Sequence, residues 1–315
     1  LKKSGVGIVY ISHRMEEIFS ICDRATVLKD GTLVGTVDTK DTTEDKLIAM
    51  MVGRNMEDMY GIEHVKPGET ILKVDGISRG KAFQDVSFEV KKGEIFGMFG
   101  LVGSGRTEIV RSIFGADVKD EGTVTFMGKK ADFTKPSQGI EAGIALLPEN
   151  RREQGLALGL SIADNTNTVA IRKISRMGVV NNKKGVEIAQ AYCDKLRTKT
   201  PSVFQLVKNL SGGNQQKVVI SKWLAEGSEL FIFDEPTVGV DVGAKLEIYK
   251  VFETLIKEGK TIIIVSSYLP EVMGLSDRML VMYEGKQMGI LNKDEYQDER
   301  ILRLASGIRE KEKAV

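Results

Sequence analysis

Two spacings of apolar residues run through this chain, and they predict different elements. The segments "EIFGMF" (94–99), "LFIF" (230–233) and "TIIIV" (261–265) are short, continuous apolar runs, which is the pattern of strands buried on both faces of a parallel sheet. Residues 185–196 and 242–258 carry apolar residues every three or four positions instead, which predicts amphipathic helices. The pattern therefore indicates an α/β domain in which helices connect parallel strands.

The apolar pattern also repeats at long range. Residues 5–35 and 259–289 align without a gap at an offset of 254 residues, with nine identical positions. The same register continues into 43–54 and 297–308, where apolar spacing predicts a terminal helix in both copies. The second copy follows a long domain, whereas the first begins at Leu1. We therefore expect the chain to be the back end of a tandem protein that lacks most of its first half.

This repeat suggests a division of the chain. We expect residues 1–56 to be the C-terminal remnant of a first domain, 57–69 to be a linker, and 70–315 to be a complete second domain with a helical part at about 155–226. A strand at 7–11 would lack the sheet it evolved to cover. Four apolar side chains of the remnant should then be exposed or mispacked, namely Ile8, Val9, Ile11 and Ile18. We expect His64, in the linker, to be exposed and inert.

Composition excludes several classes of protein. Forty-five basic and 44 acidic residues leave a net charge of +1, so no overall field attracts nucleic acid. Cys22 and Cys193 are far apart and outside any metal-like spacing, which favours thiols in a reducing compartment. The apolar runs are far shorter than the roughly 20 residues of a membrane-spanning helix, so we expect none.

The segment "GLVGSGRTE" (100–108) matches a phosphate-binding P-loop between a strand and a helix. Its glycines let the backbone approach phosphate oxygens, the helix start directs N–H groups at them, and Thr107 is a candidate Mg²⁺ ligand. Arg106 stands where such a loop normally carries lysine, and a planar guanidinium does not reproduce the compact ammonium group. We expect ATP to be held by Gly100, Gly103, Ser104, Gly105, Arg106 and Thr107.

Two further stretches carry candidate chemistry. The strand 230–235 ends in Asp234, placed to hold Mg²⁺, and Glu235, placed to polarise the attacking water. In "NLSGGNQQKV" (209–218), Ser211 is predicted to cap a helix whose first amides are bared by two glycines, and the helix dipole favours an anion there. The start of this helix cannot bind the phosphate that the P-loop at 100 binds. The phosphate that binds at Ser211 must therefore come from elsewhere.

Together these motifs resemble the nucleotide-binding domain of an ABC transporter, with "LSGGNQQK" as signature, "FDEPT" as Walker B, the "GVD" turn ending in Asp241, and the "IIVSS" strand. The resemblance covers the whole chain. It is strongest to the tandem ATP-binding subunits of bacterial monosaccharide importers, which also carry arginine in the second P-loop and "DEPT.GVDVGAK". Phrases such as "YISHRMEEIF", "IAMMVGR" and "RTKTPS" are more similar to the galactose and methyl-galactoside type than to the ribose type.

The resemblance implies roles for individual residues. In this family two domains enclose two ATP molecules, each between the P-loop of one domain and the signature of the other. A parallel core sheet, an antiparallel β subdomain and a helical subdomain would build each domain. Glu149 stands at the Q-loop position, where the family often has a glutamine that ligates Mg²⁺, and Ser267 replaces the switch histidine, to which His13 corresponds in the first copy. The sites so implied, facing the absent first domain or a second copy, include Ser211, Gly212, Gly213, Gln215 and Asp241.

Three departures, at Arg106, Glu149 and Ser267, converge on one nucleotide. We therefore expect that site to bind ATP and hydrolyse it slowly, with Glu235 still in place. The basic run "NRRE" (150–153) is expected to be solvated surface at the start of the region that touches the membrane subunit. An aromatic residue is expected to stack on adenine, and its assignment to Phe83 or Phe88 stays open.

The implied function is an ATPase subunit that energises monosaccharide import, with ATP and Mg²⁺ as cofactors. It would lie peripherally on the cytoplasmic face of the bacterial inner membrane, against the permease subunits and, through them, a periplasmic sugar-binding protein. An alternative is a regulatory half that clamps ATP without hydrolysing it. A soluble ABC ATPase of translation or DNA repair is disfavoured by the near-neutral charge. The sugar is not determined by these motifs.

Overall fold

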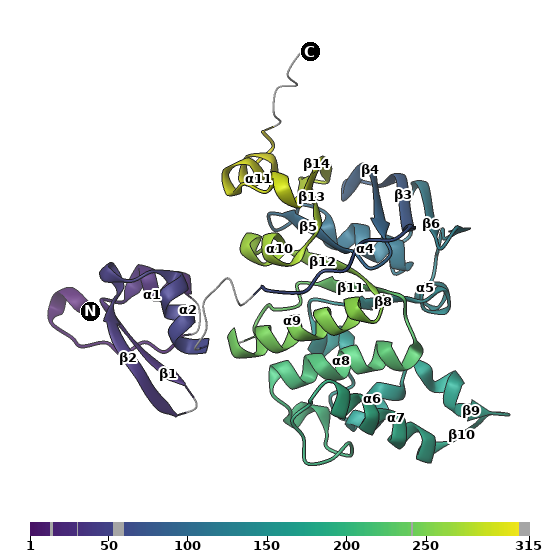
Figure 1. Ribbon diagram of the computed structural model, residues 1–315, viewed down its shortest axis with the longest axis horizontal. Coiled ribbons are helices and arrows are strands. Elements are labelled where there is room, and N and C mark those ends of the chain that lie inside the picture. Colours follow the sequence, from purple (N-terminus) through teal and green to yellow (C-terminus); the bar gives the residue numbers. More distant parts are fainter. Residues whose placement is uncertain (13–14, 30, 53–59, 241, 309–315) are drawn as a thin grey trace, which may run out of the picture.

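The computed structural model describes residues 1–12, 15–29, 31–52, 60–240 and 242–308 (Figure 1). The elements before residue 60 are η1 (Lys2–Ser4), α1 (Met15–Ile21), β1 (Arg24–Lys29), β2 (Thr32–Asp38), η2 (Thr39–Asp41) and α2 (Glu44–Val52). In Figure 1 they form the purple part of the chain, and α2 packs against α9 of the larger part.

A ten-stranded sheet organises the rest of the chain. Its strands, in spatial order, are β7 (Lys129–Lys130), β6 (Glu121–Phe126), β3 (Thr70–Arg79), β4 (Phe83–Lys91), β14 (Lys286–Asn292), β13 (Arg278–Tyr283), β5 (Ile95–Gly100), β12 (Thr261–Ser266), β11 (Leu230–Asp234) and β8 (Ile144–Leu147). The strands from β13 to β8 run parallel, and β3, β4, β6 and β7 pair antiparallel. The predicted α/β fold with a parallel core and an antiparallel wing is confirmed.

Helices cover the parallel strands because these strands are apolar on both faces. Every residue of β5, β11 and β12 is buried. The covering and terminal helices are α4 (Arg106–Phe114), α5 (Pro136–Ala142), α9 (Val242–Lys257), α10 (Leu269–Leu275), η6 (Lys293–Glu295) and α11 (Asp298–Ala305). No helix in the described part of the chain has the length and apolarity that crossing a membrane requires.

The predicted helical part lies at one end of the molecule, on the side away from β3, β4 and β6 (Figure 1). Its elements are η3 (Arg151–Gly155), α6 (Ile162–Asn167), η4 (Ala170–Ile174), β9 (Ser175–Arg176), β10 (Val179–Val180), α7 (Asn182–Lys195), η5 (Val207–Asn209) and α8 (Gly212–Glu226). The small hairpin β9–β10 was not predicted, because two-residue strands leave no periodic signal.

The internal repeat has a structural counterpart. Adding 254 to the bounds of α1, β1, β2 and η2 gives those of α10, β13, β14 and η6. Even the irregularity in the hairpin recurs, between Val27 and Leu28 in β1 and between Val281 and Met282 in β13. The same local sequence pattern has therefore produced the same local structure twice.

The predicted strand at 7–11 is the exception, and that prediction was wrong. Its twin, β12, is paired with β5 on one side and β11 on the other, whereas residues 6–12 are in no strand. A strand gains its hydrogen bonds only from a neighbouring strand, and the described residues supply none here. As expected, three of its apolar side chains are exposed, with fractions of 56% for Ile8, 92% for Val9 and 93% for Ile11. Ile18 differs, because it packs half-buried against the core.

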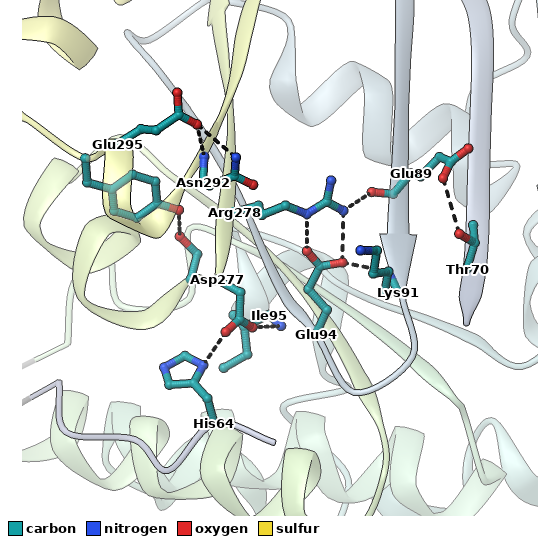
Figure 2. A network of polar contacts seen from close by, with 12 residues as sticks. His64, Thr70, Glu89, Lys91, Glu94, Ile95, Asp277, Arg278, Asn292 and Glu295 are labelled. Carbon is teal, nitrogen blue, oxygen red and sulfur yellow. Dashed lines mark hydrogen bonds and ion pairs between the residues drawn. The ribbon is translucent and has the colours of Figure 1, made fainter. Parts of the chain in front are cut away.

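The segment before β3 contacts the larger part of the chain, which contains the ten-stranded sheet. The Tyr60 ring lies 5.5 Å from that of Tyr249, and Gly274 leaves room for it. His64 Nδ1 lies 2.8 Å from Asp277 Oδ1 (Figure 2), and Asp277 also accepts a hydrogen bond from the backbone N–H of Ile95, where β5 begins. His64 is an exposed residue, as predicted, but its side chain is only 25% exposed and pairs with Asp277, which the sequence did not indicate.

The repeat offers a matched pair of substitutions. Ile11 is exposed and its twin Val265 is fully buried. We expect Ile11→Ser to change the free energy of unfolding by no more than about 0.5 kcal/mol. Val265→Ser should lower it by about 2–5 kcal/mol, because it leaves a cavity and buries a hydroxyl group. Urea denaturation of both variants measures the difference, and equal losses would contradict the assignment of Ile11 to the surface.

Candidate nucleotide-binding site

The loop between β5 and α4 has the tight geometry of a phosphate cradle. Gly103 and Gly105 adopt φ of 81° and 93°, a left-handed conformation that favours glycine. A Cβ on Gly105 would lie 2.4 Å from the carbonyl oxygen of Ala82, and one on Gly100 would lie 2.5 Å from that of Met282. Close backbone approach thus requires glycine at positions 100 and 105, and the left-handed backbone favours it at Gly103.

Two buried polar groups of this loop have no partner. The Ser104 hydroxyl and Arg106 Nη1 are shielded from solvent without a hydrogen bond, and both residues are buried, at 3% and 6% exposure. Buried donors are nearly always satisfied in folded proteins, because an unmet one costs about 1–3 kcal/mol. Orphan donors at the start of a helix match what phosphate oxygens would satisfy, so the residues present fit a nucleotide phosphate.

Arg106 faces the carboxylate expected to activate water. Its Nη2 lies 3.5 Å from Glu235 Oε1, and the two side chains are only 7% and 11% exposed. Burial lowers the pKa of Arg106, an effect that Glu235 and Asp234 oppose. Burial raises the pKa of Glu235, while Arg106 and a hydrogen bond from Ser267 counteract that rise. Arg106, Glu235 and Ser267, predicted from separate motifs, are therefore brought together.

The backbone supports this arrangement. Glu235 has φ of 48°, which is uncommon for a residue other than glycine. Its N–H donates to the carbonyl oxygen of Val265, at 2.8 Å. The neighbouring strand β12 thus holds the residue in a strained conformation just beyond the end of β11.

A set of oxygen atoms suitable for Mg²⁺ lies beside the P-loop. The Thr107 hydroxyl donates to Asp234 Oδ1 at 3.2 Å, and burial raises the pKa of Asp234 to about 7. Thr107, Asp234 and Glu149 line one cavity of about 220 Å³, together with Glu108 and Arg111.

The hydroxyl and carboxylate groups of this cavity fit a bound Mg²⁺ that also has phosphate and water ligands. Hydroxyl and carboxylate oxygens are the ligands it prefers, and it usually takes one or two carboxylates together with phosphates and water. The described residues contain no group of three acidic, histidine or cysteine side chains able to hold a metal ion alone.

The signature stretch begins α8, as predicted, but its residues face different ways. Ser211 is the N-cap and is exposed, although its hydroxyl accepts from the Asn214 side chain and from no backbone N–H. Gly212 is half-buried, and Gly213 is buried where a Cβ would meet Ala244. Gln215 is 1% exposed and donates to the carbonyl of Val207. Of these four candidate residues, only Ser211 and Gly212 are not buried, and neither is among the described residues that line the P-loop cavity.

Of four other candidates, the structure describes only two. His13 and Asp241 lie outside the described residues. Phe83 and Phe88 are buried in the core, at 0% and 3% exposure, so neither presents a ring to an adenine base.

Sequence reasoning missed a cluster of contacts made by "NRRE". Arg151 donates to the Val238 carbonyl at 3.3 Å and reaches the Gly212 backbone. Arg152 donates to Gln215. The basic run was interpreted as solvated surface because its partners lie more than 60 residues away along the chain, where no local pattern reveals them.

Comparison with known proteins identifies the fold that carries these residues. Residues 83–238 match the family model described as ABC transporter. A crystal structure of a nucleotide-free ATP-binding cassette from an ABC transporter superposes with a TM-score of 0.63 at 22% identity, covering 75% of this chain and 98% of that one. The chain has the fold of an ABC ATPase. A dimeric cassette in a post-hydrolysis state, bound to ADP and Pi, shares this fold with a TM-score of 0.61 at 20% identity, over 71% of this chain and 99% of that one.

Curated relatives of the cassette are named for sugar import. A ribose/galactose/methyl galactoside import ATP-binding protein of Geobacillus kaustophilus is 47% identical over 98% of this chain and 61% of its own length. A ribose import ATP-binding protein of Clostridium tetani is 47% identical over 97% of this chain and 61% of its own length. The chain therefore spans about three fifths of the length of these relatives.

The raised pKa of Asp234 predicts a pH-dependent stability effect. A carboxyl group that titrates near 7 when folded and near 3.8 when unfolded binds more protons in the folded state, so stability falls as pH rises from 4 to 7. Asp234→Asn should therefore stabilise the nucleotide-free cassette above pH 7, by at most about 4 kcal/mol, and the gain should shrink toward pH 4. Thermal unfolding across this range measures it. Asp294→Asn, at an exposed position, supplies the baseline; a gain that grew at low pH would contradict the assignment.

Proposed function

We propose that this cassette binds Mg²⁺ and ATP and serves as the ATP-hydrolysing subunit of a bacterial monosaccharide importer. The observation that carries the proposal is that the P-loop holds two unsatisfied buried donors, on Ser104 and Arg106, while its Arg106 and Thr107 contact the carboxylates at the end of β11. The names of the relatives add sugar import as the process that the ATP would drive.

Each residue of the site has a physical task in this proposal. Ser104, Arg106 and the amides at the start of α4 bind and orient the phosphates. Thr107, Asp234 and Glu149 would hold Mg²⁺, which, when bound, neutralises charge that develops on the transferring phosphate. Glu235 orients a water molecule and accepts its proton, and Ser267 positions the Glu235 carboxylate through a hydrogen bond.

We propose that turnover at this site is slow. Arg106 forms a buried pair with Glu235, the residue that would accept the proton. The same guanidinium would also have to bind the phosphates. Ser267 has a hydroxyl where a histidine would supply a second titratable group. Loss of a well-placed proton-transfer group costs on the order of 10²- to 10⁴-fold in rate.

The exposed start of α8 supports a role in a shared site. Ser211 and Gly212 lie at the surface and outside the P-loop cavity, so a phosphate that binds there would be brought by a second cassette. That cassette would be either a further domain or a second copy of the chain. In the importer we expect permease subunits to hold the pair at the cytoplasmic face of the membrane, with a periplasmic sugar-binding protein acting through them.

The ion pair also favours a second candidate function. If Arg106 does not leave Glu235 when ATP binds, the cassette clamps the nucleotide without hydrolysing it and acts as a regulatory half. Binding without turnover distinguishes this candidate from the first.

Steady-state hydrolysis and calorimetric ATP binding test these proposals on the full chain. We expect slow, Mg²⁺-dependent turnover that Glu235→Gln abolishes while binding is retained, because the amide cannot accept a proton. Turnover in the wild type equal to that of Glu235→Gln would favour the regulatory half, and failure to bind ATP would reject both.

Arg106→Gln tests the phosphate contact separately. Since hydrogen bonds to charged groups contribute about 1.5–3 kcal/mol, the variant should weaken ATP binding roughly tenfold to hundredfold. Lys129→Gln, at an exposed position on β7, removes the same charge away from the site and should leave binding unchanged. Equal effects of the two substitutions would mean that Arg106 does not contact the phosphates.

A further inference from the structure

The loop that carries Glu149 packs along one face of α8. Arg151 lies against Gly212, Arg152 donates to Gln215, a Cβ on Gly155 would lie 3.3 Å from Val219, and Lys222 donates to the Gly155 carbonyl at 2.7 Å. The partners on α8 follow one another at intervals of three, four and three residues, which places them on one helical stripe.

Arg151 also contacts a third segment of the chain, the turn after β11. Its Nη1 donates to the Val238 carbonyl, in the turn that follows Glu235, at 3.3 Å. Its Nη2 would lie 2.8 Å from a Cβ on Gly212, and the bare glycine makes room for the guanidinium. Its buried Nε has no hydrogen-bond partner among the described residues. Within those residues, Arg151 thus bonds to the backbone of the turn after β11 and lies close to the start of α8.

The side chain stands outside the cavity beside the P-loop. Glu149, Asn150 and Gln154 line that cavity from the same loop, and Arg151 does not. Arg151 therefore does not line the space that a ligand in the cavity would occupy, and the loop backbone connects it to Glu149, two residues earlier. Arg152 is the natural contrast, since it has the same charge and touches α8, but through an exposed side chain at 3.4 Å.

We propose that Arg151 is a positioning residue, whose guanidinium fixes the loop of Glu149 to the first turn of α8 and to the turn after β11, and so sets where the Glu149 carboxylate stands relative to Mg²⁺. The inference rests on the proposed binding of Mg²⁺ and ATP at this site. A planar guanidinium reaches two backbone segments at once in a fixed geometry, which an ammonium group does not. The three segments that carry Glu149, Gly212 and Glu235 thereby move as one.

Calorimetric titration of the full chain with ATP, once in excess Mg²⁺ and once in EDTA, tests the proposal. Arg151→Gln should weaken binding in Mg²⁺ roughly threefold to tenfold, the effect of one lost hydrogen bond, and leave binding in EDTA unchanged. Arg152→Gln should change neither titration. Arg151→Lys should recover only part of the lost affinity, because lysine retains the positive charge but lacks the planar guanidinium.

A second variant reaches the same contact from the other side. In Gly212→Ala the new methyl group displaces the guanidinium, so the same Mg²⁺-specific loss is expected. Since both changes break one contact, the double variant with Arg151→Gln should lose no more than either single variant. This variant also decides the question if Arg151→Gln does not fold, which thermal unfolding reveals.

The outcomes separate the inference from the function beneath it. Equal losses in Mg²⁺ and in EDTA would assign Arg151 a general structural role and overturn the proposal, as would wild-type affinity in both media. If the wild type binds ATP in neither medium, the proposed function fails and the positioning role fails with it.

Discussion

One buried guanidinium between two buried carboxylates dominates this molecule. Arg106, Asp234 and Glu235 meet where the P-loop and the end of β11 come together, and each is largely removed from water. Burial penalises all three charges, which is why the pKa of each carboxyl group is raised and that of the guanidinium is lowered. Such a cluster is a poor way to stabilise a fold, because desolvation can exceed the mutual attraction. The cluster therefore favours the proposal that this site binds a polyanion together with a divalent cation.

The sheet explains how these charges come to meet. β5 lies beside β12, and β12 lies beside β11, with all three strands parallel. Their carboxyl ends therefore open on the same edge, and residues more than 100 positions apart become neighbours. Helices on the apolar faces hold the strands rigidly, and β12 fixes the strained backbone of Glu235 through Val265. The loop of Glu149 follows β8, the next strand along this edge, and α8 supports that loop from outside.

Where prediction from the sequence failed, long-range contacts were responsible. Residues 7–11 carry the apolar pattern of a strand, yet a strand needs hydrogen-bonded neighbours, and the twin β12 has two where this segment has none among the described residues. His64 has a polar, irregular local sequence and is exposed, but its side chain pairs with Asp277. Both cases depend on segments distant in the chain. Ser211 was correctly predicted to cap α8, whereas the inward turn of Gln215 depends on Val207, eight residues earlier.

The sequence by itself determined the α/β class, the parallel strands, the P-loop, the acidic end of β11 and the duplicated element pattern, because these follow from local periodicity and from residue types at fixed spacing. Tertiary structure alone decided that Arg106 engages Glu235, that Gly213 is closed off by Ala244, and that Arg151 bonds to the Val238 carbonyl close to the start of α8. The reason is physical: spacing along a chain specifies backbone conformation over a few residues, whereas burial and charge pairing depend on which distant segments share a volume.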